Sequence, residues 1–260
     1  MKSITVVIPI YNEVDSLKEL HSELTSVLSR NDHYELLFID DGSSDGSIDI
    51  LNELSTLDPH TKVVEFYRNY GKAAALAEGF KLAEGEYIVT MDADLQDDPA
   101  EINNLILEIN NGIDIVSGWK KNRNDPISKT FPSRIFNYIV RFFSDVKIHD
   151  FNCGLKAYKK VVVKSLNLYG GMHRFIPFLA SLNGFKTSEI IINHRKREFG
   201  KSKYSSSRLL KGLFDFLTVL FIAKYSKRPM HFFGRLGLCS SLFGLSILFY
   251  LTIQWLNGQW

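Results

Sequence analysis

Apolar runs rich in β-branched residues alternate with segments of helical periodicity along the first half of the chain. The runs read ITVVIPIY, YELLFIDD, KVVEFYRN, GEYIVTMDAD and GIDIVSGW. Between them, helices are predicted over 14–30, 44–57, 72–84 and 99–111 from periodic apolar residues, an alanine-rich composition and helix-start residues. Strands that alternate with helices in this way predict βαβ units and a mostly parallel sheet.

Polar motifs follow four of these runs at the points where the strands should end. They read YNE, DDGSSDGS, RNYGK and DADLQ. Ligands of open α/β sheets bind at the carboxyl ends of the strands, so the four motifs are expected to share one site. A G-x-G-x-x-G fingerprint does not follow the first run, and the chain has no P-loop motif. A nucleotide held by a glycine cradle is therefore not expected.

The stretch TMDADLQDDPAE, residues 90–101, places five carboxylates close together after an apolar run. Like charges at this spacing repel one another, so the stretch is either a solvated acidic loop or a cation site. Asp92, Asp94 and Gln96 alternate along the chain and can converge on one ion. Oxygen ligands suit a hard divalent cation such as Mg²⁺ or Mn²⁺. Asp97 and Asp98 precede a proline and are predicted to cap a helix.

The composition excludes several other classes of protein. The 260 residues suffice for one large domain or two small ones, and a net charge of +2 argues against a general nucleic-acid binder. Cys153 and Cys239 have no metal-site spacing and are interpreted as reduced thiols. His149, His173 and His194 also lack ligand spacing, so we interpret them as surface or satisfied core residues.

The C-terminal stretch from Leu236 to Trp260 contains no charged residue and is long enough to cross a bilayer. Four basic residues stand just before it, which predicts a cytoplasmic location for that side: Lys224, Lys227, Arg228 and Arg235. The preceding segment, roughly 206–224, is predicted to be an amphipathic helix in the membrane interface, with a core-packed helix as the alternative. The N-terminus does not fit a signal peptide, so the chain is expected to start in the cytoplasm.

Together these motifs resemble a family 2 glycosyltransferase with the GT-A fold. The resemblance rests on VVIPIYNE, IDDGSSDGS, RNYGKAAAL, MDADLQDDP and REFGKSKY, and it covers residues 1 to about 225. Within that family the chain is similar to the polyprenyl-phosphate branch, which includes dolichol-phosphate mannose synthases and bactoprenol-phosphate sugar transferases. DADLQDDP, the R-x-x-G-x-S-K-Y pattern and the membrane segments carry this closer similarity.

The resemblance implies roles for particular residues. It implies a nucleotide-sugar site made of Pro9, Tyr11, Glu13, Ile39, Asp41, Asp92, Ala93, Arg197 and Lys203. Arg197 and Lys203 would hold the diphosphate, and Asp92, Asp94 and Gln96 would hold Mg²⁺ or Mn²⁺ against it. Asp94 and Asp150 are the catalytic candidates; Asp150 is a general base, a residue that orients the acceptor, or a structural residue. Lys120, where relatives usually have Arg, and Arg134 would face an acceptor phosphate.

The sequence therefore predicts an α/β, GT-A nucleotide-sugar-binding fold with a mostly parallel sheet. The expected layout is a catalytic domain over 1–204, an amphipathic juxtamembrane segment over 205–234 and a transmembrane helix over 235–260. The expected activity is metal-dependent, inverting transfer of a hexose from a nucleotide-diphosphate sugar to a polyprenyl phosphate at the cytoplasmic membrane face. The alternatives are transfer to a sugar hydroxyl of a glycan, and an inactive membrane-anchored protein that binds nucleotide-sugar or lipid.

Overall fold

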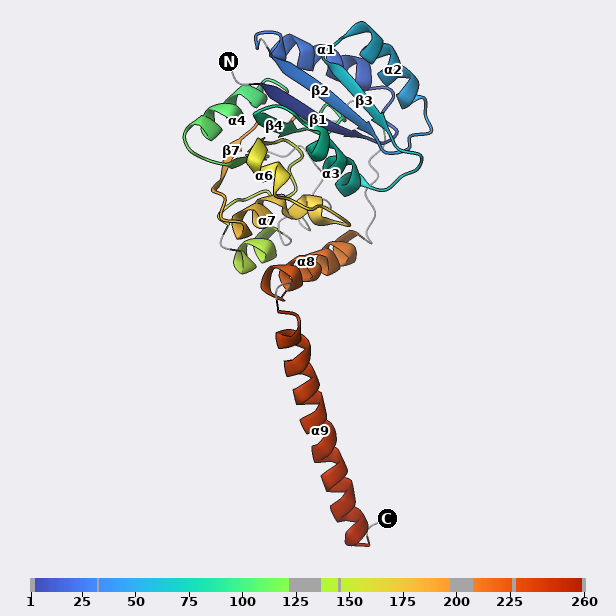
Figure 1. The fold of residues 1–260 in the computed structure, drawn as a ribbon, viewed down its shortest axis with the longest axis vertical. Coiled ribbons are helices and arrows are strands. Elements are labelled where there is room, and N and C mark those ends of the chain that lie inside the picture. Colours follow the sequence, from blue (N-terminus) through green and yellow to red (C-terminus); the bar gives the residue numbers. More distant parts are fainter. Residues whose placement is uncertain are drawn as a thin grey trace. The chain divides into compact units, whose positions relative to one another are not determined.

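The computed structural model describes residues 3–31, 33–121, 137–144, 146–196, 208–225 and 228–258. Within the chain there are two compact units, Met1–Phe216 and Leu217–Trp260. The first holds the sheet and its covering helices, and the second holds the apolar C-terminal helix (Figure 1).

The first unit is organised around a seven-stranded sheet with the order β3-β2-β1-β4-β6-β5-β7. Its strands are β1 (Ile4–Ile10), β2 (Tyr34–Asp40), β3 (Thr61–Glu65), β4 (Tyr87–Thr90), β5 (Ile115–Trp119), β6 (Lys156–Lys159) and β7 (Thr187–Ile191). The pairs β3·β2, β2·β1, β1·β4 and β5·β7 are parallel, whereas β6 runs antiparallel to both β4 and β5. The predicted mostly parallel sheet is thus confirmed, and β6 and β7 are strands that the apolar runs did not reveal.

The helices described in this unit begin and end within or near the predicted ranges where such ranges exist. They are α1 (Leu17–Leu28), α2 (Ser47–Leu57), α3 (Lys72–Leu82), α4 (Glu101–Asn110), α6 (Lys160–Lys164), the 3₁₀ turn η1 (Met172–Phe175) and α7 (Ile176–Leu182). Residues 137–143 are also helical.

Alternate residues of β1 explain how helices cover both faces of the sheet. Ile4, Val6, Ile8 and Ile10 are buried in one apolar cluster with leucines of α1 and apolar residues of α4. Val7 points to the other face, where α3 contacts β1 and β2. This is the period of two that a strand buried on both faces should show.

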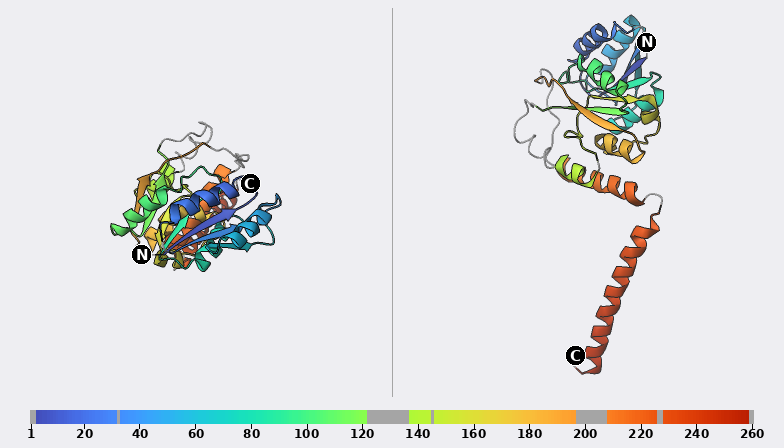
Figure 2. Two further views of the ribbon diagram at one scale, coloured as in Figure 1. Left: turned by 90° about the horizontal axis from the view of Figure 1, so that it is seen from above. Right: turned by 90° about the vertical axis from the view of Figure 1, so that its left-hand side faces the viewer.

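The second unit contains the end of α8 (Arg208–Tyr225) and all of α9 (Met230–Leu256). Aromatic rings join the two helices: the ring centroids of Phe221 and Phe232 lie 5.2 Å apart, as do those of Tyr225 and Phe232. Figure 2 shows α9 as one continuous helix. The most apolar stretch of 18 residues within α9 has a mean hydropathy of 1.9 and none of it is buried, so α9 is a candidate membrane span by length and composition.

Candidate active site

The YNE and DDGSSDGS motifs meet at the carboxyl ends of β1 and β2. Asn12 N–H donates to Ser43 Oγ at 2.9 Å, and Ser44 N–H donates back to Asn12 Oδ1 at 2.8 Å. Glu13 N–H donates to Ser47 Oγ at 3.2 Å. Asn12 reaches this position with a φ of 53°, in the left-handed region that asparagine tolerates better than most residues.

Asp41 draws the RNYGK motif into the same rim. Its two carboxylate oxygens accept the backbone N–H groups of Tyr70 at 2.7 Å and Gly71 at 2.8 Å. Burial raises the pKa of Asp41 above its ordinary value, although the two N–H groups oppose that shift. Asp41 thus fixes the loop between β3 and α3, while its role toward a nucleotide remains a prediction.

The remaining predicted nucleotide contacts of this rim lie on or beside the same strands. Pro9 and Ile39 are paired across β1 and β2, which places them side by side near the carboxyl ends. Tyr11 follows β1 with 39 % of its surface exposed, and Ala93 is buried in the loop after β4. The structure therefore brings together the predicted residues of the first, second and fourth motifs.

Asp92 lies two residues beyond β4 and forms an ion pair with Lys72, the first residue of α3. Burial alone would raise the pKa of Asp92, but the charge and hydrogen bond of Lys72, with Lys120 and Lys156, lower it to about 2. Asp92 is consequently a carboxylate at neutral pH. Lys72 was not predicted as a site residue, although it ends the quoted RNYGK motif.

Gly154 lies directly against the Asp92 carboxylate. A Cβ atom at position 154 would stand 2.6 Å from both Cγ and Oδ2 of Asp92. The Gly154 carbonyl accepts the Thr90 hydroxyl at 2.9 Å, which ties this loop to β4. Only a residue without a side chain fits here, so the Cys153-Gly154 element serves to admit Asp92.

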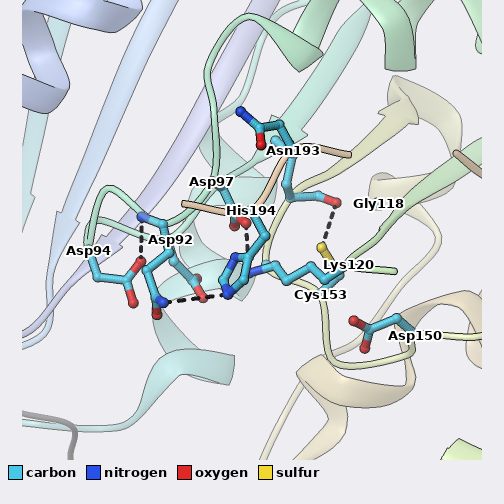
Figure 3. A network of polar contacts seen from close by, with 12 residues as sticks. Asp92, Asp94, Asp97, Gly118, Lys120, Asp150, Cys153, Asn193 and His194 are labelled. Carbon is cyan, nitrogen blue, oxygen red and sulfur yellow. Dashed lines mark hydrogen bonds and ion pairs between the residues drawn. The ribbon is translucent and has the colours of Figure 1, made fainter. Parts of the chain in front are cut away.

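The rest of the acidic stretch turns sharply after Asp94. Leu95 has a φ of 58°, a strained value for a bulky residue. This turn lets Gln96 N–H approach Asp94 Oδ1 at 3.3 Å, and Gln96 Nε2 lies 3.5 Å from His194 Nε2 (Figure 3). No three His, Cys, Asp or Glu side chains of the described ranges group around a common point. The predicted cation ligands are the carboxylates of Asp92 and Asp94 and the side-chain amide of Gln96. Oxygen ligands of this kind suit Mg²⁺ or Mn²⁺.

Asp97 and Asp98 were predicted to cap a helix, but the N-cap residue of α4 is Ala100. Asp98 Oδ1 accepts Ala100 N–H at 3.0 Å, at the start of α4. Asp97 is fully buried and pairs with Lys120, whose Nζ lies 2.7 Å from Asp97 Oδ1. The chain turns Asp97 inward because Asp97 pairs by a β-bridge with His194.

Lys156 and His173 are polar groups of this region that the sequence did not assign to the site. Lys156 is buried on β6, and its ammonium donates to the Cys153 carbonyl. Burial lowers the pKa of Lys156. Burial and the nearby charges of Lys72, Arg174 and Lys156 lower the pKa of His173 to about 3, so its imidazole is neutral.

Asp150 is also buried, in the loop that leads to β6 (Figure 3). Its Oδ1 accepts Asn152 N–H at 3.1 Å, and its carbonyl accepts the Ser117 hydroxyl at 3.3 Å. Both contacts shape the loop, and the choice between base, acceptor-orienting and structural roles stays a prediction.

Three predicted site residues, Arg134, Arg197 and Lys203, lie outside the described residues. Several contacts hold the chain just before Arg197. Arg195 N–H donates to the Gln96 carbonyl at 2.8 Å, and the Arg195 guanidinium pairs with Glu23 at 2.7 Å and Asp98 at 3.0 Å. The segment that leads to the predicted diphosphate-binding residues therefore starts beside the acidic stretch.

A sheet with polar motifs at its carboxyl edge, two acidic residues after β4 and an apolar terminal helix defines a glycosyltransferase of the GT-A type. Comparison with known proteins agrees: residues 5–166 match the profile of Glycosyl transferase family 2. The dodecaprenyl-phosphate galacturonate synthase of Rhizobium johnstonii is 36 % identical over 254 residues, which cover 95 % of this chain and 75 % of that protein. The undecaprenyl-phosphate 4-deoxy-4-formamido-L-arabinose transferase of Salmonella choleraesuis is 35 % identical over 264 residues, covering 100 % and 79 % respectively. The chain belongs to glycosyl transferase family 2.

Solved structures share the fold at lower sequence identity. Glucosyl-3-phosphoglycerate synthase from Mycobacterium tuberculosis, in complex with phosphoglyceric acid, matches with a TM-score of 0.65 and 18 % identity, over 85 % of this chain and 80 % of that one. A mannosyltransferase from Pyrobaculum calidifontis, in complex with GDP-Man and Mn²⁺, matches with a TM-score of 0.57 and 19 % identity, over 83 % and 64 %. The predicted GT-A fold is thereby confirmed.

Proposed function

We propose that this protein transfers a hexose from a nucleotide-diphosphate sugar to a polyprenyl phosphate, with inversion, at the cytoplasmic face of a membrane. The observation that carries the proposal is the similarity to two relatives named for dodecaprenyl and undecaprenyl phosphate, which extends over 95 % and 100 % of the chain. The apolar helix α9 supports it, because an acceptor with a polyprenyl tail resides in a bilayer.

Asp92, Asp94 and Gln96 are the residues proposed to hold a divalent cation, Mg²⁺ or Mn²⁺. A cation bound there supplies positive charge to the diphosphate leaving group. The low pKa of Asp92, about 2, keeps its carboxylate ionised for this role. Two structures with the same fold, the mannosyltransferase and a complex of the glucosyl-3-phosphoglycerate synthase, were each solved with Mn²⁺ and a nucleotide-sugar.

The nucleotide-sugar is proposed to lie along the rim formed by the first, second and fourth motifs. Tyr11, Glu13 and Asp41 would contact the base and ribose, because carboxylates accept hydrogen bonds from hydroxyl and N–H groups. Arg197 and Lys203 are proposed to hold the diphosphate.

The acceptor phosphate is proposed to meet Lys120 and Arg134. A phosphate monoester has a second pKa of about 6, so it is largely dianionic at neutral pH and needs cations more than a strong base. A sugar hydroxyl would need a base to take its proton. Lys72, Lys120 and Lys156 all act electrostatically on Asp92, and this concentration of ammonium groups favours an anionic acceptor.

The test is a transfer assay with the full chain in detergent and a panel of UDP- and GDP-sugars. Undecaprenyl phosphate is the acceptor, undecaprenol is the phosphate-free control, and the lipid product is identified by mass spectrometry. We expect a product only with the phosphate, its loss in EDTA and its recovery with Mg²⁺ or Mn²⁺. Full activity in EDTA would refute the cation site, and transfer to undecaprenol or to glycans alone would favour the hydroxyl acceptor.

A further inference from the structure

A buried ion pair joins three segments of the site that are far apart in the sequence. Asp97 belongs to the loop after β4, and Lys120 directly follows β5. The β-bridge between Asp97 and His194 adds the segment after β7, and Ile192 N–H donates to the Trp119 carbonyl at 3.2 Å. Figure 3 shows Asp97, Lys120 and His194 clustered beside Asp92. The pair therefore occupies the centre of this cluster.

The charge of Asp97 is compensated by Lys120. The Asp97 side chain has no exposed surface, and 13 % of the Lys120 side chain is exposed. Neither carboxylate oxygen of Asp97 accepts a hydrogen bond of ordinary geometry from the residues that the structure describes. Among those residues, the Lys120 ammonium, with Nζ at 2.7 Å, is therefore the main group that compensates the buried negative charge of Asp97. Replacing a buried ion pair by apolar residues of similar volume often leaves a protein equally or more stable, so a contribution to stability alone does not explain the presence of this pair.

The pair has a clear effect on Lys120. Burial lowers the pKa of the Lys120 ammonium, but the charge of Asp97, with a smaller contribution from Asp92, more than offsets this and raises the pKa above its ordinary value. Burial also raises the pKa of Cys153 to about 12, so this thiol stays neutral at neutral and mildly alkaline pH. Cys153 faces Lys156 as well. Asp97 thus fixes the Lys120 ammonium in place and opposes the effect of burial on its pKa.

We propose that Asp97 is a positioning residue for the acceptor phosphate, which acts by holding the Lys120 ammonium in place and in its charged form. An ammonium carries three N–H donors, so a contact with Asp97 leaves donors for phosphate oxygens. The proposal rests on the proposed function, since it needs a phosphate acceptor.

Binding of a soluble prenyl phosphate tests the proposal without knowledge of the sugar donor. Calorimetry would measure the affinity of the full chain in detergent for farnesyl phosphate, with farnesol as the phosphate-free probe, from about pH 7.5 to about pH 9.5. In this range the phosphate is dianionic, because its second pKa is about 6. We expect wild-type affinity for farnesyl phosphate to stay constant across the range.

Asp97→Asn should make that affinity fall with rising pH by about tenfold, because burial without Asp97 lowers the Lys120 pKa. Lys120→Met should bind weakly at every pH, and the Asp97→Asn/Lys120→Met double variant should match it, since Asp97 acts through Lys120. Lys120→Arg should restore a constant affinity in the Asp97→Asn background, because a guanidinium stays charged.

Asp114→Asn is the matched control. Asp114 also pairs with a lysine, Lys159, at 2.7 Å, but it precedes β5 at the opposite end of that strand. It should behave as wild type. A constant, wild-type affinity in Asp97→Asn, or a further loss in the double variant beyond Lys120→Met, would overturn the positioning role. Equal wild-type affinity for farnesol and farnesyl phosphate would instead overturn the phosphate acceptor itself.

A second variant covers the case in which Asp97→Asn does not fold. Asp97→Glu keeps the negative charge but displaces the ammonium by one methylene. Positioning predicts weaker binding of farnesyl phosphate with no pH dependence over the same range. Unchanged affinity in a folded Asp97→Glu protein would contradict it.

Discussion

Replacing Gly154 by alanine should damage the site through a single steric contact. The new Cβ would stand 2.6 Å from Cγ and Oδ2 of Asp92, and ordinary contact begins at 3.4 Å. The carboxylate or its supporting loop must therefore shift by about 0.8 Å, and overpacking of this kind costs about 1–3 kcal/mol of stability. A displacement near 1 Å at reacting groups can lower the rate about 100-fold, so we expect kcat/KM to fall by about 10- to 100-fold.

Two measurements separate the effect on the site from the effect on stability. Calorimetry with Mn²⁺ and UDP or GDP reports the cation and nucleotide affinity, and thermal unfolding reports stability. Gly112→Ala is the control, because Gly112 has a φ of +95° and nothing within 4 Å of its added Cβ. It should cost about 1 kcal/mol of backbone strain and leave the affinities unchanged. Wild-type affinity and turnover in folded Gly154→Ala would refute the assigned position of Asp92.

Three further outcomes are expected. Asp41→Ala should lower the free energy of unfolding by about 1–3 kcal/mol, as measured by urea denaturation, because it removes the two hydrogen bonds that the N–H groups of residues 70 and 71 donate to a carboxylate. Because the pKa of Asp92 is lowered to about 2, its ion pair with Lys72 stabilises the fold above about pH 4, and this stabilisation is lost as the pH falls towards 2. Lys72→Met should therefore weaken the fall in the free energy of unfolding at acidic pH. An unchanged dependence of stability on pH would contradict this. A cysteine at Gln259, in a chain without other exposed cysteines, should react with an impermeant reagent in intact cells, whereas protection of a membrane-inserted protein would oppose the proposed topology.

The arrangement of the first four strands follows from local sequence. Each apolar run is long enough for a strand, each intervening segment is periodic enough for a helix, and parallel strands place their carboxyl ends at one edge. The four polar motifs could therefore be assigned to one rim from the sequence alone. β6 escaped this reasoning because its sequence, Lys-Ala-Tyr-Lys, has no apolar run, and its antiparallel place between β4 and β5 is set by distant partners.

Side chains whose roles depend on the tertiary structure could not be predicted in the same way. Lys72 and Lys156 look like surface lysines in the sequence, and only packing brings both toward Asp92. The position of Asp97 in the sequence, shortly before a proline, suggests a helix-capping residue, as does that of its neighbour Asp98. The bridge to His194, ninety-seven positions along the chain, turns Asp97 inward to Lys120.

The sequence by itself determined the family, the rim and the apolar terminal helix, because each rests on residues that are close together in the chain. The tertiary structure alone decided which charges are paired. The ionisation of Asp92, the need for Gly154 beneath it and the burial of the Asp97–Lys120 pair all depend on contacts between residues twenty or more positions apart or on loss of water around them. Burial and Coulomb energy depend on distance in space, which a linear pattern of residues does not contain.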